Sequence, residues 1–132
     1  MRLLPAFLIC LALPVAAQDA DAGKALFQTH CATCHGVAAS GDGPMANMLL
    51  VRPPDLTTLT QRYGGTFPIA RIVMRIDGRD PLTSHGSPMP VYGDFFEGWD
   101  VAVKAETGQP IMTSVPVVDL LAYLAGVQGS GG

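Results

Sequence analysis

The sequence has few cysteines, few basic residues and no hydrophobic run as long as a membrane-spanning helix. Its 132 residues include three cysteines, and eight Lys or Arg side chains stand against eleven Asp or Glu. So few cysteines exclude the framework of several disulfides that usually stabilises a small secreted domain. The formal charge of -3, without a cluster of Lys or Arg, argues against binding to nucleic acid or to an anionic membrane surface.

Residues 1–17 are predicted to be a secretory signal peptide. Arg2 precedes a short apolar run, and small residues ending at Ala17 follow it. Because the run is shorter than the ~20 residues of a spanning helix, we expect cleavage rather than stable membrane insertion. Cys10 would leave with the peptide, and residues 18–132 would form one domain with seven basic and eleven acidic side chains.

The two remaining cysteines lie in one short motif, Cys31-Ala32-Thr33-Cys34-His35. Two thiols separated by two residues can reach both vinyl groups along one edge of a haem, which places the adjacent histidine beneath the iron. We therefore predict that Cys31 and Cys34 attach one haem c covalently through thioether bonds. His35 is the predicted proximal ligand of the iron.

Two other chemistries use closely spaced cysteines. A thioredoxin-like dithiol requires a strand-to-helix context within a βαβ pattern, whereas the residues before Cys31 have the pattern of a helix. A structural zinc site requires four ligands, and His30 and His85 form no second paired spacing. We expect His30 to be an ordinary residue on a helix surface. Haem attachment, which takes place outside the cytoplasm, also agrees with the predicted signal peptide.

Residue spacing predicts a helix at each end of residues 18–132. The first covers 19–30 and begins with acidic side chains, which favour the positive end of the helix dipole. The last begins after a capping Ser114 and ends at Gly126 or Gly129. Gly23 lies inside the first helix, where glycine costs about 1 kcal/mol relative to alanine. We therefore expect Gly23 to mark the close approach of another backbone, with the two terminal helices crossing.

Two further helices are predicted between the terminal ones. A short helix over 57–63 would end at Gly64, and a longer one over 66–77 has an apolar face and a terminating Gly78. No strand pair is predicted, so the remaining segments are expected to be loops. The long segment 94–113 contains three aromatic residues that we expect mainly to pack in the core: Phe95, Phe96 and Trp99.

A loop in the second half of the chain contains the candidate for the second iron ligand. Met89 lies between Pro88 and Pro90, on a stiff backbone that limits the movement of its sulfur. Methionine opposite histidine is the ligand pair that raises the potential of electron-carrying haem. Met89 is therefore the predicted distal ligand, although most methionines only fill gaps in a core. His85 and Met112 are the alternatives.

These features resemble the bacterial class I c-type cytochromes over nearly all of residues 18–132. The resemblance implies an all-α class I cytochrome c fold, a small helical domain wrapped around one covalently attached haem, with crossed N- and C-terminal helices. In that family a proline carbonyl after the Cys-x-x-Cys-His motif accepts a hydrogen bond from the proximal imidazole. The resemblance assigns this role to Pro54, with Pro53 and Pro44 as alternatives.

The resemblance also implies a periplasmic electron carrier rather than an enzyme. With two axial ligands the iron has no open position for a substrate, so we expect single-electron transfer between redox partner proteins. The protein would act as a monomer in transient complexes, and its mild acidity favours basic docking surfaces on its partners. Two alternatives stay open: a haem subunit of a dehydrogenase or oxidase complex, and a haem protein whose open sixth site binds gases or supports peroxidase-like chemistry.

Overall fold

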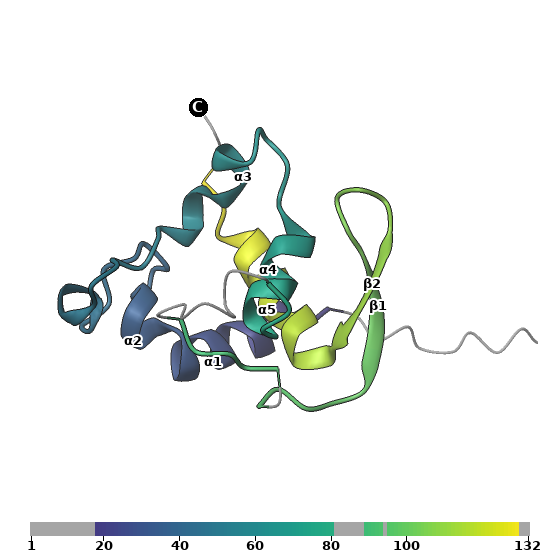
Figure 1. Cartoon of the computed structure of the whole chain (residues 1–132), viewed down its shortest axis with the longest axis horizontal. Coiled ribbons are helices and arrows are strands. Elements are labelled where there is room, and N and C mark those ends of the chain that lie inside the picture. Colours follow the sequence, from purple (N-terminus) through teal and green to yellow (C-terminus); the bar gives the residue numbers. More distant parts are fainter. Residues whose placement is uncertain (1–17, 81–88, 94, 130–132) are drawn as a thin grey trace, which may run out of the picture.

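The computed structural model describes residues 18–80, 89–93 and 95–129, which form a mainly helical domain with one small hairpin of strands (Figure 1). The mainly helical fold predicted from the sequence is confirmed. The predicted signal peptide and His85 lie outside the described residues. Within those residues, none of the helices combines the length and the apolar character that crossing a bilayer requires.

The α-helices are α1 (Ala20–His30), α2 (Ala32–His35), α3 (Leu59–Arg62), α4 (Ile69–Ile76) and α5 (Val115–Gly126). Two 3-10 helices, η1 (Ala46–Met48) and η2 (Leu56–Thr58), and the strands β1 (Asp100–Lys104) and β2 (Pro110–Ser114) complete the set.

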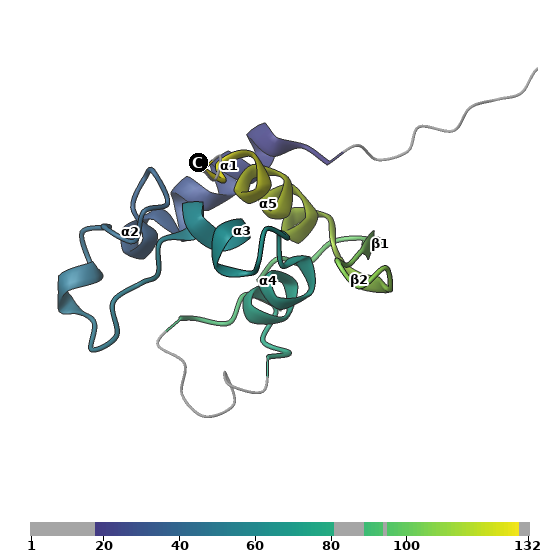
Figure 2. The ribbon, with the colours of Figure 1, turned by 90° about the horizontal axis from the view of Figure 1, so that it is seen from above.

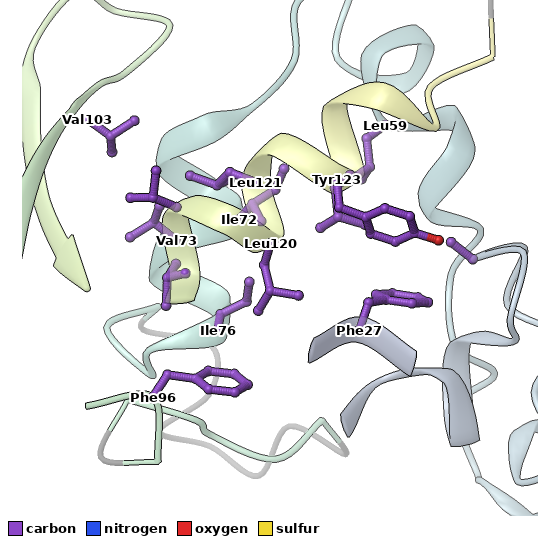
Figure 3. Packing of buried hydrophobic residues seen from close by; sticks show 14 of the residues in the cluster. Phe27, Leu59, Ile72, Val73, Ile76, Phe96, Val103, Leu120, Leu121 and Tyr123 are labelled. Atoms are coloured by element: carbon purple, nitrogen blue, oxygen red, sulfur yellow. The ribbon is translucent and has the colours of Figure 1, made fainter. Parts of the chain in front are cut away.

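The two terminal helices, α1 and α5, cross at Gly23. A β-carbon at Gly23 would overlap the backbone carbonyl of Asp119 in α5, so the contact requires glycine. The backbone N–H of Asp19, the residue that caps α1, donates to the Asp119 carboxylate at 2.9 Å. One turn beyond Gly23, the rings of Phe27 and Tyr123 pack with their centroids 5.2 Å apart (Figure 3). The predicted crossing of the terminal helices is confirmed.

Helix α5 lies between α1 and α4 (Figure 2), and it contributes more buried residues to the core than any other described element. Three residues of α4, Ile72, Val73 and Ile76, are buried against it, which is the apolar face predicted from the sequence (Figure 3). Helix α4 begins at Ile69, three residues later than the predicted range, because Pro68 is its N-cap. The helix ends before Gly78, whose φ of 82° is the left-handed conformation that glycine permits.

The short helix predicted over 57–63 is confirmed as η2 followed by α3. The Asp55 carboxylate caps η2 by accepting a hydrogen bond of 2.8 Å from the backbone N–H of Thr57. Gly64 and Gly65 follow α3 with φ values of 69° and 87°, so the chain leaves the helix in a conformation that only glycine adopts readily.

The prediction of no strand pair was wrong, because β1 and β2 form an antiparallel hairpin with Asp100 opposite Ser114. In both strands side chains alternate between covered and exposed, and the covered Val103 faces the start of α5 (Figure 3). Five-residue strands joined by a tight turn are too short to give a strong pattern in the sequence.

The prediction for the aromatic residues near the hairpin was right only in part. Phe96 is a core residue, whereas Phe95 and Trp99 are 64% and 87% exposed.

Candidate functional site

The Cys-x-x-Cys-His motif lies where α1 ends and α2 begins. The N–H of Cys31 donates to the carbonyl of Phe27 at 2.8 Å, and the N–H of His35 donates to the carbonyl of Cys31 at 2.9 Å. The chain therefore continues from one helix into the next within a single residue. This turn brings Cys31, Cys34 and His35 to the wall of one cavity, and both cysteine side chains are partly exposed.

The loop that follows the motif folds back on α2. The N–H of Gly41 donates to the carbonyl of His35 at 2.8 Å, and that of Gly43 donates to the carbonyl of Cys34 at 3.2 Å. A β-carbon at Gly43 would lie only 2.6 Å from the Cys34 backbone, so glycine allows this close approach. The backbone carbonyls at the end of α2 thus accept hydrogen bonds from the loop, and these bonds hold the backbone that carries the motif in place.

The His35 imidazole is buried, with 8% of its surface exposed, and its Nδ1 lies 3.3 Å from the carbonyl oxygen of Pro54. Burial lowers the pKa of His35, and the hydrogen bond to Pro54 opposes this effect only in part, so the ring is neutral at pH 7. With its proton on Nδ1, the ring donates to Pro54 and leaves the lone pair of Nε2 for a metal. Of the three prolines considered, Pro54 is the one whose carbonyl contacts His35.

The environment of Cys31 does not suit thiol–disulfide exchange. Burial raises the pKa of the Cys31 thiol to about 11, and the nearby Cys34 adds to this rise. Catalytic dithiols have the opposite property, a lowered pKa that provides the reactive thiolate at neutral pH. Within the described part of the chain, no three His, Cys, Asp or Glu side chains are grouped closely enough to hold a metal ion. The geometry therefore favours neither a thioredoxin-like dithiol nor a zinc site.

The motif opens onto a cavity of about 490 Å³, a size typical of small-molecule sites. Met89 lines the same cavity and is the only methionine that does so among the described residues. Met112, the alternative ligand within those residues, lies on β2 and is 52% exposed. Part of the apolar lining comes from α3, α4 and α5, which contribute Leu59, Ile72, Ile76, Leu120 and Leu124.

The charged residues that line the cavity are all cationic among the described residues, although residues 18–132 are acidic overall. The Arg71 guanidinium lies 5.4 Å from the centre of the Tyr63 ring, and Arg75 is 3.6 Å from the Asp80 carboxylate. An apolar cavity with a cationic lining fits a ligand that has an apolar body and carboxylates, as a haem has. The charge of the cavity lining is therefore opposite in sign to the net charge of the chain. The lining arginines are Arg52, Arg62, Arg71 and Arg75.

Sequence reasoning missed the part played by His30 and Tyr92. The prediction of an ordinary surface position for His30 was wrong, because its ring lines the cavity and lies edge-on to Phe95 and Phe96 at 4.9 and 5.4 Å. The Tyr92 hydroxyl donates to the carbonyl oxygen of His30 at 2.9 Å. The available signal was the position of Tyr92, three residues after Met89, but no local pattern indicates which distant carbonyl it contacts.

Comparison with known proteins gives one match. The family model described as Cytochrome c matches residues 20–128, which is most of the chain and includes the five α-helices of the described residues. No curated protein and no solved structure matches the chain. The cavity fits the group that this family carries, because two thiols, a neutral buried imidazole and an apolar wall meet in it. The chain belongs to the cytochrome c family, whose members bind covalently attached haem c and serve in haem-based electron transfer.

Proposed function

We propose that this protein is a periplasmic electron carrier whose haem c is held by Cys31 and Cys34 and ligated by His35 and Met89. One observation carries the proposal: Met89, far from the motif in the chain, lines the same apolar cavity as the two thiols and the imidazole. A histidine and a methionine on one haem would occupy both axial positions of the iron, which suits electron transfer rather than substrate binding.

Each side chain has a defined task in this proposal. The thiols of Cys31 and Cys34 each add across one vinyl group: a sulfur–carbon bond forms, and the thiol hydrogen goes to the other vinyl carbon. His35 offers Nε2 to the iron, while the Pro54 carbonyl accepts a hydrogen bond from the Nδ1–H group and fixes the ring. The arginines of the cavity lining supply cations for the haem carboxylates. Bound haem supplies the one-electron change between ferric and ferrous iron.

Attachment and ligation can be tested on protein made in a host that matures c-type cytochromes. Acid–acetone extraction should leave the colour with the polypeptide, and the mass should exceed that of the chain by one haem. The oxidised protein should show the far-red band of sulfur-to-iron coordination, and the reduced protein should bind carbon monoxide poorly. Loss of the colour on extraction would overturn covalent attachment, and rapid carbon monoxide binding would point to an open sixth site instead.

Two further measurements test the proposed location and the carrier role. The mature protein should be found in the periplasmic fraction and begin at Gln18, directly after the predicted signal peptide. It should also purify as a monomer and exchange electrons with soluble redox partners. A stable complex with a dehydrogenase or an oxidase would replace the free carrier with a dedicated haem subunit.

A further inference from the structure

One short segment connects the two sides of the haem cavity. Residues 89–93 begin with Met89, the proposed distal ligand, and we call them the distal strap. The Tyr92 hydroxyl donates to the carbonyl oxygen of His30, which lies 62 residues earlier and directly precedes Cys31. The backbone N–H of Tyr92 donates to the carbonyl of Ile76, in the last turn of α4, at 2.8 Å. A single residue thus ties the strap to both α1 and α4.

The strap also packs closely on the end of α4. A β-carbon at Gly93 would lie 2.6 Å from the carbonyl oxygen of Asp77, and one at Gly78 would overlap the side chain of Val91. At Gly93 backbone therefore meets backbone, and at Gly78 the absence of a side chain leaves the space that Val91 occupies. The end of the strap beyond Met89 is consequently fixed against α4.

The Tyr92 ring is held as firmly as its hydroxyl. It stacks on Phe96, with ring centroids 5.2 Å apart and planes tilted by 20°, and Phe96 is only 4% exposed. Burial raises the pKa of Tyr92, so the hydroxyl keeps its proton at neutral pH and remains a hydrogen-bond donor. The stack on Phe96 would survive removal of the hydroxyl, which separates the effect of the hydrogen bond from that of packing.

We propose that the Tyr92 hydroxyl is a positioning group that holds the sulfur of Met89 on the haem iron. Because the hydroxyl bonds the strap to the residue before Cys31, it sets the spacing between the distal and the proximal sides of the cavity. A thioether is a neutral and weak electron-pair donor, so its bond to iron depends on a backbone that does not let it drift. This inference rests on the proposed function, since it requires Met89 as a ligand.

The test compares Tyr92→Phe with Tyr123→Phe in the haem-loaded protein. Both variants lose one tyrosine hydroxyl, but Tyr123 packs on Phe27 in the core and is not among the residues that line the cavity. In Tyr92→Phe the population with Met89 off the iron should rise about fivefold, the factor that corresponds to the net contribution of one hydrogen bond. Carbon monoxide should bind the reduced variant faster by the same factor, whereas Tyr123→Phe should match the wild type.

A urea titration separates positioning from general stabilisation. In Tyr92→Phe the far-red band should disappear at a lower urea concentration than the helical circular dichroism, because the sulfur leaves the iron before the helices unfold. The inference is overturned if the two signals shift together, if Tyr92→Phe behaves like Tyr123→Phe, or if Tyr92→Phe accumulates without haem. A wild-type protein that lacks the far-red band would overturn the ligation by Met89 itself, which is a separate result.

Discussion

The proximal and distal sides of the cavity are built in different ways. On the proximal side the two thiols and the imidazole come from five consecutive residues, and hydrogen bonds between near neighbours hold them in one turn. On the distal side Met89 lies on a strap held by contacts with His30 and Ile76, which are remote from it in the chain. The proximal side depends on local geometry and the distal side on tertiary contacts. We therefore expect the distal contacts to be lost first when the protein is unfolded.

The largest effect is expected from variants that remove one of the side chains on the proximal side. His35→Ala and Cys31→Ser should each prevent maturation, because the haem in our proposal fills the cavity and completes the apolar core. Haem staining and the yield of coloured protein would measure this loss. Thr33→Ala is the matched control, since Thr33 lies within the motif but is exposed, and it should retain haem. A folded, haem-free His35→Ala protein would show that the core forms without the haem.

The next largest effect is expected when only Met89, the proposed distal ligand, is removed. Met89→Ala should retain covalent haem but lose the far-red band, become high-spin or water-ligated, and have a lower midpoint potential. Absorption spectroscopy and a redox titration would measure these changes. Met48→Ala is the control, because Met48 is 77% exposed and does not line the cavity. An unchanged spectrum of Met89→Ala would move the assignment to His85 or Met112.

A smaller effect is expected where the terminal helices support both sides of the cavity. Gly23→Ala would force a β-carbon against the Asp119 carbonyl and should lower the free energy of unfolding by about 1–3 kcal/mol, as overpacking does. Gly126→Ala is the control, since nothing lies within 4 Å of the position of its β-carbon. Urea unfolding of both variants would test this, and equal midpoints would contradict the close crossing of α1 and α5.

The smallest effect is a pH dependence on the proximal side. Hydrogen bonds from the Thr57 side chain and backbone lower the pKa of Asp55, which directly follows Pro54. Because this pKa is lower in the folded state, the stabilisation is present above about pH 3.8 and is lost as the pH falls through the folded value. Asp55→Asn should therefore lower the urea midpoint slightly at pH 7 and converge with the wild type at low pH.

The exposed Glu97 provides a control for that measurement. Glu97→Gln removes one negative charge far from Pro54 in the sequence. The change in urea midpoint between pH 7 and low pH should therefore be the same in Glu97→Gln as in the wild type. If Asp55→Asn and Glu97→Gln respond alike, the effect belongs to net charge and not to the hydrogen bonds from Thr57.

Much of the fold could be predicted because its signals are local. Helical spacing and caps gave all of the longer helices, and Gly23 indicated a close backbone contact that the structure shows. The hairpin was missed, and Trp99 was expected in the core but is exposed, because burial depends on neighbours that a local pattern does not contain. His30 was assigned to the surface for the same reason.

The attachment motif and the helices could be predicted from local sequence, since both depend on residues a few positions apart. Three features depend on how the chain folds: Met89 lines the cavity, the Pro54 carbonyl meets His35, and the charged lining is cationic. The fold also places the Tyr92 hydroxyl on the backbone of His30. These contacts join residues far apart in the chain, so they form only when the helices and the loops between them pack together.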